Sequence, residues 1–398
     1  MQEDIIFLNL ANIRDLEKDA IFTLMPDLAL VYLGEYLVSK GYNAKIFDEH
    51  VDGRIDDNPN LFTDSRFIGI SMYGLNNNLN LSRIAKWKSQ YPGTKFIIGG
   101  SSVGFDIFDK PDFIDYMVIG QGYYALGQIL SRHSPQIIMG GRNELDFPAS
   151  FFLTPLCKYK SAALLCSLGC PFSCTFCLSN KLKIFQTRKK ENVFQELDLI
   201  LGSGIKYFEF FDDIFTLCPY IDELTSKIKQ SNKKWGCVID SRQTTSSFKT
   251  KLCSMIDSGL STIGFGFESL SNITLRAINK KLTNEQIKWN LETVRDLRVN
   301  NLRQHAFLMY GLPFQTKENH LRDIETIESY GFYSQSTHLK VIRGTKLWDL
   351  KDSFGIETDD NGLVTRTDWM SNGDLLELDL VMDKRNKQQI KAIWAGLV

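Results

Sequence analysis

Short apolar runs alternate with amphipathic stretches over most of the chain. In residues 1–135 this alternation is typical of an open, doubly wound (Rossmann-like) parallel sheet. Ligands of such sheets bind at the carboxyl ends of the strands, so Ser71, Gly99 and Gly100 are candidate ligand contacts. The predicted strands are Ile5–Leu10, Ala44–Phe47, Phe67–Ser71, Lys95–Ile98 and Tyr116–Ile119, and the predicted helices are Leu28–Ser39, Leu79–Ser89 and Tyr123–Leu130.

A second alternating series runs from residue 161 to residue 345. Its strands and intervening helices favour a partial (β/α)6 barrel of the TIM type, with the site at the carboxyl-end face of the strands. The pattern breaks in residues 136–160, which we interpret as a connector, and weakens in residues 346–398, which we interpret as a C-terminal extension. The predicted strands are Ala162–Cys166, Tyr207–Phe211, Trp235–Asp240, Thr262–Phe267, Gln304–Tyr310 and Ser336–Val341.

The composition indicates a soluble protein without a polyanion partner. Hydrophobic residues make up 43% of the 398 residues, and 46 basic side chains balance 47 acidic ones. Nucleic-acid binders usually carry a basic excess, which is absent here. No apolar run approaches the ~20 residues that cross a bilayer, and the first ten residues lack the features of a signal peptide. We therefore predict a cytoplasmic protein with no membrane span.

Five of the eight cysteines fall between Cys157 and Cys177. In a reducing compartment such a group indicates metal ligands or core residues rather than disulfides. Cys170, Cys174 and Cys177 have the spacing C-x3-C-x2-C directly after a predicted strand. Three thiolates on one loop suit an iron–sulfur cluster. With three ligands for a four-iron cube, one iron stays open to the amine and carboxylate of a small molecule.

A structural zinc ion is the alternative for this loop. Zinc usually takes four ligands in two C-x2–4-C pairs, and that spacing is absent. Cys166 could supply a fourth thiol, and it creates a second register, C-x3-C-x3-C, with Cys170 and Cys174. Because Cys166 falls inside a predicted strand, we expect it to be a buried thiol that binds no metal. The zinc alternative implies a zinc-stabilised binding protein rather than an enzyme.

The segment Gly169-Cys-Pro-Phe-Ser-Cys-Thr-Phe-Cys177 resembles the radical S-adenosylmethionine (radical SAM) superfamily, including the aromatic Phe176 before the last cysteine. The resemblance spans most of the predicted barrel. It implies a 4Fe–4S cluster on Cys170, Cys174 and Cys177 and reductive cleavage of bound S-adenosylmethionine. It further implies a 5′-deoxyadenosyl radical that abstracts hydrogen from a small-molecule or peptide substrate, and an external electron donor such as flavodoxin or ferredoxin.

Two further segments are similar to those with which the superfamily binds the polar groups of the cosubstrate. Asp212 and Asp213 end the second predicted strand of the barrel, where polar groups of the family meet the cosubstrate amine. The alternative for both is a cap on the next helix. Arg242 follows the third strand, where an arginine of similar proteins faces the carboxylate or ribose. An arginine on the protein surface is the alternative there.

The fourth and fifth predicted strands end in segments that also resemble the family. Glu268 and Ser269 match its Gly-x-Glu-Ser segment, for which helix capping is the alternative. Gly311 and Pro313 belong to a Gly-Leu-Pro segment whose backbone passes the adenine in the family. The residues that usually follow are Gly-Glu-Thr, but here they are Phe-Gln-Thr. Packing or surface roles are favoured over hydrogen donation or substrate contact for four other residues, Cys218, His305, Tyr310 and His338.

Four segments of residues 1–135 resemble the cobalamin-binding-type domain that precedes the barrel in one radical SAM subclass. A corrin needs a flat apolar ledge above the strand ends and a slot for its nucleotide tail, and the slot would lie at Ser71, Gly99 and Gly100. The Asp-x-His-x-x-Gly signature of cobalt-ligating relatives is missing, since no histidine precedes His50. Members of the subclass often bind cobalamin without a histidine ligand, and some bind no corrinoid. The segments are Met25–Leu37, Phe67–Ser71, Ile97–Gly100 and Val118–Gly122.

The expected reaction depends on whether cobalamin binds. With cobalamin, the resemblance implies methylation of an unactivated carbon. Without it, a radical dehydration, cyclisation, epimerisation or bond formation is expected. A radical enzyme that modifies tRNA or a protein is a further alternative, and the balanced charge weighs against tRNA. No sequence pattern identifies the substrate.

Overall fold

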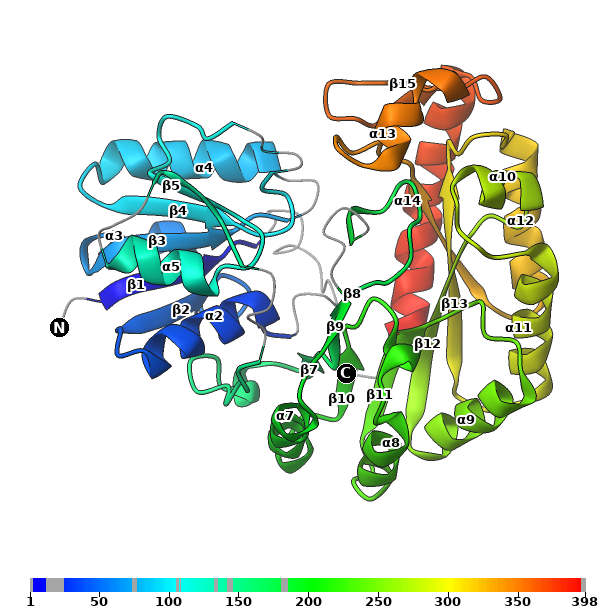
Figure 1. The fold of residues 1–398 in the computed structure, drawn as a ribbon, viewed down its shortest axis with the longest axis horizontal. Helices are drawn as coiled ribbons and strands as arrows, with labels where there is room; N and C mark the ends of the chain where they lie inside the picture. The colour runs from blue at the N-terminus through cyan, green and yellow to red at the C-terminus, as the bar shows by residue number, and fades with distance from the viewer. Residues whose placement is uncertain are drawn as a thin grey trace. The chain divides into compact units, whose positions relative to one another are not determined.

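The computed structural model describes residues 3–11, 25–73, 77–104, 107, 109–131, 135–141, 146–179 and 185–394. The chain divides into two compact units. The first consists of Met1–Leu164 with Glu191–Ile205, and the second of Leu165–Lys190 with Lys206–Val398. Figure 1 shows that each unit combines strands with helices. No helix in the described ranges is long and apolar enough to cross a membrane.

The first unit contains a six-stranded parallel sheet with the order β2-β1-β3-β4-β5-β6. The predicted doubly wound sheet is thereby confirmed, and β6 lies within the residues that the sequence pattern predicts as a connector. The strands are β1 (Glu3–Asn9), β2 (Ala44–Asp48), β3 (Ser65–Ser71), β4 (Lys95–Gly99), β5 (Tyr116–Ile119) and β6 (Ile137–Met139). The helices are α2 (Leu28–Ser39), α3 (Asn60–Thr63), α4 (Asn77–Gln90), α5 (Tyr123–Leu130) and α7 (Lys190–Gly202).

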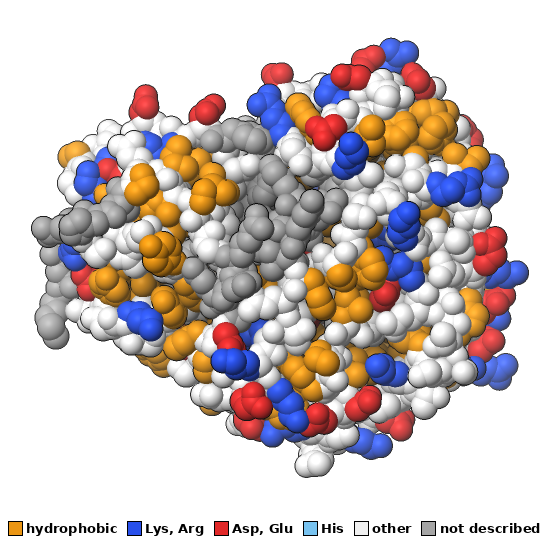
Figure 2. Space-filling view, viewed as in Figure 1, with side chains coloured by type: hydrophobic (Ala, Val, Ile, Leu, Met, Phe, Trp, Pro, Cys, Tyr) orange, Lys and Arg blue, Asp and Glu red, His pale blue; other side chains and the backbone are white. Residues whose placement is uncertain are grey.

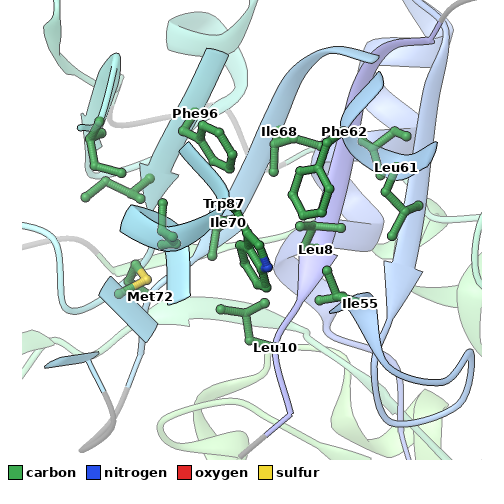
Figure 3. Close-up of a cluster of buried hydrophobic side chains, with 14 of the residues drawn as sticks. Leu8, Leu10, Ile55, Leu61, Phe62, Ile68, Ile70, Met72, Trp87 and Phe96 are labelled. Atoms are coloured by element: carbon green, nitrogen blue, oxygen red, sulfur yellow. The ribbon is translucent and has the colours of Figure 1, made fainter. Parts of the chain in front are cut away.

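Successive residues of the central strands pack into two cores on opposite faces of this sheet, as the two-residue period of a strand requires. Ile6 and Leu8 join Trp87 of α4 in one core, whose side chains converge in Figure 3. Ile5 and Phe7 belong to the other core, which includes residues of α2 and α5. Burial of both faces explains why these strands are almost entirely apolar. The polar residues of the sheet are therefore concentrated at the strand ends.

The second sheet has the order β14-β13-β12-β11-β10-β7, and its pairs from β10 to β14 are parallel. A helix-containing segment joins each of these successive strands, which confirms the partial (β/α)6 barrel. The strands are β7 (Ser161–Leu164), β10 (Tyr207–Phe210), β11 (Lys234–Ile239), β12 (Leu260–Glu268), β13 (Arg303–Tyr310) and β14 (Tyr333–His338). The helices are α8 (Ile221–Lys229), α9 (Ser246–Asp257), α10 (Asn272–Ala277), α11 (Asn284–Asp296) and α12 (Lys317–Ser329).

Two boundaries differ from the sequence-based expectation. β7 ends at Leu164, so Cys166 follows the strand instead of lying inside it, although its side chain is fully buried. β14 covers residues 333–338, whereas the pattern predicts a strand over 336–341. Polar residues along β14 hide its start. The hydroxyl of the buried Ser334 donates to Glu328, and the backbone of the buried Ser336 is hydrogen-bonded to Asn386.

The C-terminal extension is regular in structure despite its weak sequence pattern. It contains α13 (Lys346–Leu350), the antiparallel pair β15 (Glu357–Thr358) and β16 (Val364–Arg366), and α14 (Asn372–Trp394). Asn386 of α14 bonds the backbone of Ser336 on β14 at 2.6 and 3.0 Å. Leu376 and Leu380 on α14 are exposed, and these apolar surface residues blur the amphipathic pattern.

Figure 2 shows basic and acidic side chains interspersed on the visible face of the molecule.

Candidate functional site

The three cysteines predicted as cluster ligands lie on the loop that joins β8 (Ser167–Gly169) to β9 (Phe185–Thr187), two short antiparallel strands. Gly169 opens the loop with a φ of 78°, a conformation that favours glycine. Cys174 is buried, while Cys170 and Cys177 are half-buried. The backbone N–H of Cys177 donates to the carbonyl of Cys174 at 3.2 Å. The spacing C-x2-C therefore forms a tight turn.

Backbone and side-chain hydrogen bonds fix this loop to neighbouring segments of the barrel. The N–H of Thr175 donates to the carbonyl of Ile278, just after α10, at 2.9 Å, and the carbonyl of Thr175 accepts from Leu347 of α13 at 2.8 Å. The Nδ2 group of Asn279 donates to the carbonyl of Ser173 at 2.8 Å. The loop is thus held in place by segments more than a hundred residues away in the chain.

Burial raises the pKa of the Cys170 and Cys174 thiols. The ammonium of Lys280 acts against this increase at Cys174, and the guanidinium of Arg242 does so at both thiols. Metal binding requires thiolates, so nearby cations favour it. In the described ranges, no three His, Cys, Asp or Glu side chains form a ready-made site for a single metal ion. In a four-iron cube each thiolate binds a different iron atom.

Glu268 forms a half-buried ion pair with Lys280 beside the cysteine loop. Its Oε1 lies 2.8 Å from the Nζ of Lys280, and the two side chains are 11% and 16% exposed. The backbone of Glu268 has a φ of 65°, and the register of β12 with β13 shifts between Gly266 and Glu268. A left-handed conformation in a glutamate is strained, and a bulge redirects the side chain that follows it. The strand end therefore turns Glu268 towards Lys280.

Arg242, which follows β11, lies against the cysteine loop. Its guanidinium carbon lies 3.0 Å from the centre of the Phe172 ring, and its Nε donates to Asp240 at 2.6 Å. The buried Nη1 of Arg242 has no hydrogen-bond partner among the described residues. A buried guanidinium donor without a partner is costly, and a bound carboxylate would satisfy it.

The two predicted aspartates differ in environment. Asp212 is buried, accepts from the N–H of Cys166 at 3.0 Å and from the Oγ of Ser167 at 2.5 Å, and thereby supports the start of β8. Burial raises the pKa of Asp212 to about 6. Asp213 is exposed, and its negative charge contributes to the raised pKa of Cys170. Asp213 is consequently the aspartate that a bound amine could reach.

Ser269 and the Gly-Leu-Pro segment are engaged within the protein. The Oγ of Ser269 donates to Asp323 of α12 at 2.9 Å. Gly311 has a φ of 83°, and a side chain there would contact Val364 and Leu375 of the extension at 3.5 Å. Pro313 is buried in the loop that follows. Gln315, where the family usually has glutamate, is fully buried and donates to the carbonyl of Met309 at 2.9 Å.

The residues for which packing roles were favoured lie inside the protein. Tyr310 donates to Asp379 of α14 at 2.6 Å, and the Nδ1 of His338 lies 2.9 Å from the same carboxylate oxygen. The thiol of Cys218 is hydrogen-bonded to that of Cys166. His305 is buried, its Nδ1 has no partner in the described part of the chain, and burial lowers its pKa to about 4. Phe176 is half-buried within the cysteine loop.

Sequence reasoning missed Lys280. It lies in the turn after α10, within Asn279-Lys280-Lys281, which resembles an exposed basic turn in the sequence. Asn279 and Lys281 on either side have φ values of 52° and 54°. Two left-handed residues separated by a single position are unusual outside glycine, but backbone conformation is not visible in the sequence. The ion pair with Glu268 depends on this conformation and on tertiary packing.

The carboxyl edge of the first sheet carries both polar and exposed apolar side chains. Gly100 has a φ of 100°, and a Cβ there would lie 2.7 Å from the carbonyl oxygen of Met72 and 3.0 Å from the Oγ of Ser71. The backbone N–H of Met72 donates to the carbonyl of Gly99 at 2.7 Å. The predicted slot residues therefore pack directly on one another. Exposed large side chains near the same strand ends are Tyr73 (49%), Tyr124 (58%) and Met139 (69%).

A chain of polar side chains crosses the carboxyl ends of β3, β1 and β2. The hydroxyl of Tyr73 donates to the Oδ1 of Asn9 at 3.4 Å, and the Nδ2 of Asn9 lies 3.5 Å from the Nδ1 of His50. That Nδ1 lies 2.8 Å from the Oδ1 of Asp48, which also accepts from Tyr159 through its other oxygen at 3.0 Å. The strand ends of the first unit thus present polar groups close to apolar surface.

The chain is similar to known proteins in sequence and in fold. Residues 164–327 match the Radical SAM superfamily. An uncharacterized methyltransferase of Pyrococcus horikoshii is 29% identical over 243 residues, which cover 58% of this chain and 51% of that protein. The chain therefore spans about half the length of this curated relative.

Two solved structures share the fold over almost the whole chain. The radical S-adenosylmethionine methyltransferase TsrM from Kitasatospora setae, with cobalamin and a 4Fe–4S cluster bound, has a TM-score of 0.72 and 13% identity, with 95% of this chain and 91% of that chain covered. The cobalamin-dependent radical enzyme OxsB, with aqua-cobalamin and S-adenosylmethionine bound, has a TM-score of 0.72 and 15% identity, with 96% and 67% covered. Residues 164–327 of this chain are therefore a Radical SAM domain.

Proposed function

We propose that Cys170, Cys174 and Cys177 hold a 4Fe–4S cluster and that the protein cleaves S-adenosylmethionine at it. The observation that carries the proposal is one fixed loop with three cysteines, beside which Arg242 and Lys280 supply positive charge. When bound, the cluster supplies the electron that cleaves the sulfonium of the cosubstrate. The protein's own residues fix the loop, orient the cosubstrate and exclude water.

The charged side chains next to the loop fit the methionine part of the cosubstrate. A carboxylate would pair with Lys280 and with the Nη1 of Arg242, for which the described residues offer no hydrogen-bond partner. An ammonium would pair with Glu268 or with the exposed Asp213. Glu268 and Lys280 form an ion pair with each other at 2.8 Å. An exchange of these partners would replace one ion pair by two charge-assisted pairs with the ligand.

We further propose that the first unit binds cobalamin and that the reaction is methylation of an unactivated carbon. The fold is similar to that of two enzymes that bind cobalamin, one of which is a methyltransferase. The exposed Tyr73, Tyr124 and Met139 near the carboxyl edge of the sheet fit a flat apolar macrocycle better than they fit water. Ser71 and Gly100 line the edge where the nucleotide tail would lie.

The remaining partners follow from this chemistry. A small-molecule or peptide substrate is proposed, with flavodoxin or ferredoxin as the electron donor. We place the protein in the cytoplasm, because a reducing compartment keeps cluster thiols reduced and none of the eight cysteines, all of which lie in the described ranges, forms a disulfide. Oxygen would compete for the electron, which makes anaerobic conditions necessary for every assay.

The test is anaerobic reconstitution of the full chain with iron and sulfide. The wild type should bind iron and sulfide and release 5′-deoxyadenosine from S-adenosylmethionine with dithionite as reductant. Cys174→Ala should lose both properties. Cys253→Ala is the matched control, because Cys253 is an exposed cysteine on α9 and should leave both unchanged.

Three outcomes would contradict the proposal in different ways. Zinc without iron would favour a zinc-stabilised binding protein. If the Cys174→Ala variant still bound iron and still released 5′-deoxyadenosine, the assignment of the cluster to the three cysteines would be wrong. Folded wild-type protein that forms the cluster but retains no corrinoid after incubation with hydroxocobalamin would refute the cobalamin-dependent methylation alone. The radical dehydration, cyclisation, epimerisation or bond formation would then remain.

A further inference from the structure

The turn after α10 brings a cation directly to the cysteine loop. Ile278 and Asn279 hydrogen-bond to Thr175 and Ser173 of that loop, and Lys280 is the next residue. The N–H of Lys280 donates to the carbonyl of Leu275 at 2.9 Å, which closes the turn. The position of Lys280 is therefore coupled to the position of the loop through several hydrogen bonds within the same unit.

Three residues with left-handed backbones form or flank the ion pair of Lys280. Glu268, Asn279 and Lys281 are not glycines, yet all three have positive φ values between 52° and 65°. Such conformations persist only where the surrounding structure enforces them, and they gather at functional sites. Gly266 leaves room for the pair, because a Cβ there would lie 3.1 Å from the Nζ of Lys280 and 3.2 Å from the Oε1 of Glu268.

The pair places two opposite charges within electrostatic range of Cys174. Lys280 directly follows Asn279, whose side chain donates to the carbonyl of Ser173, the residue before Cys174, at 2.8 Å. Both side chains are less than one fifth exposed, so water screens their charges less than those of surface groups. A one-electron reduction adds one negative charge to a thiolate-bound cluster. Nearby fixed charges shift the potential of that reduction.

We propose that Lys280 and Glu268 set the reduction potential of the cluster as an opposed pair, with Lys280 raising it and Glu268 lowering it. This inference rests on the proposed function, because it requires a cluster on the three cysteines. Lys280 stabilises the reduced state by attraction of the added electron, and Glu268 destabilises it by repulsion. In this role both residues act through the charge of the cluster and form no bond to a reacting atom. No proton or leaving group takes part in the step.

A cosubstrate that exchanges partners with the pair would also change the potential. While Glu268 is bound to Lys280, the field of the lysine is partly cancelled. An ammonium that takes Glu268 and a carboxylate that takes Lys280 rearrange four charges beside Cys174. The pair therefore connects occupation of the cosubstrate site to the ease of cluster reduction. This connection lies within residues 268–280 and the cysteine loop.

The experiment is an anaerobic redox titration of the reconstituted full-length protein with dithionite, followed by the paramagnetic resonance signal of the reduced cluster, without cosubstrate. Lys280→Met should lower the midpoint potential, and Glu268→Gln should raise it. We expect each change to be of the order of tenfold in the reduction equilibrium, which is about 59 mV for one electron. Lys281→Met is the matched control, because this neighbouring lysine is exposed.

Opposite shifts from two nearly isosteric substitutions distinguish an electrostatic role from a structural one. Loss of loop structure would lower the iron content and would move both variants in the same direction. Iron content and circular dichroism are therefore measured for each variant. Unchanged potentials, shifts of equal sign, or an equal shift in Lys281→Met would overturn the inference. A wild type that assembles no cluster would refute the proposed function itself, so the two failures are distinguishable.

Discussion

Glu209, on β10, is a buried carboxyl group in the second unit, and its charge should destabilise the fold at neutral pH. It lies opposite Gly236 of β11 and is hydrogen-bonded to the hydroxyl of Tyr207. Burial raises the pKa of Glu209 from its ordinary value of 4.5 to about 7, against the smaller lowering effect of the Tyr207 hydroxyl. The side chain is 8% exposed, so water cannot stabilise the carboxylate.

The sign of the effect follows from which state loses its proton first. Below pH 4.5 the carboxyl is protonated in both the folded and the unfolded chain and contributes nothing. Between pH 4.5 and 7 the unfolded chain ionises first, so the free energy of unfolding falls as the pH rises. Above pH 7 the loss is complete. The difference between 4.5 and about 7 corresponds to about 3 kcal/mol, at about 1.36 kcal/mol for each pKa unit.

Glu209→Gln removes the titration and keeps the shape. The variant should therefore gain stability relative to the wild type from pH 4.5 to pH 8, by up to about 3 kcal/mol. Urea unfolding followed by tryptophan fluorescence at pH 5 and pH 8 measures this difference, with Glu325→Gln as the control at an exposed position on α12. A stability difference between variant and wild type that is the same at both pH values would refute the reasoning, because it would show that Glu209 has the same pKa in both states.

Three further predictions concern packing and support of the loop. Asp379→Ala leaves Tyr310 and His338 without their shared acceptor and should cost about 1–3 kcal/mol in urea unfolding, whereas an unchanged midpoint would show that this shared carboxylate does not stabilise the fold. Trp87→Ala leaves a cavity in the core shown in Figure 3 and should lower the free energy of unfolding by about 3–5 kcal/mol. A decrease below about 1 kcal/mol would mean that the surrounding side chains fill the cavity. Asp212→Ala removes two hydrogen bonds at the start of β8 and should lower the iron bound per chain after reconstitution, and full iron content would contradict this supporting role.

The sequence by itself determined the architecture and the cysteine loop. Strands buried on both faces are apolar over their whole length, and this property is visible as short runs such as Ile5–Leu8 and Phe67–Ile70. The three cysteines are close in the chain, so their spacing alone predicts one loop. Arg242 and Glu268 were also predicted as candidate site residues. The reason is that parallel sheets place their functional residues at the carboxyl ends of the strands.

Only the tertiary structure decided which of the polar residues face the loop. Asp212 and Asp213 are neighbours in the sequence, yet one is buried under the start of β8 and the other is exposed. Lys280 reaches Glu268 only because its turn adopts two left-handed residues and because β12 contains a bulge. Strand periodicity is a local property of the chain. The pairing of Glu268 with Lys280 depends instead on the backbone conformation of one turn and on the packing of that turn against the distant cysteine loop, which no local pattern encodes.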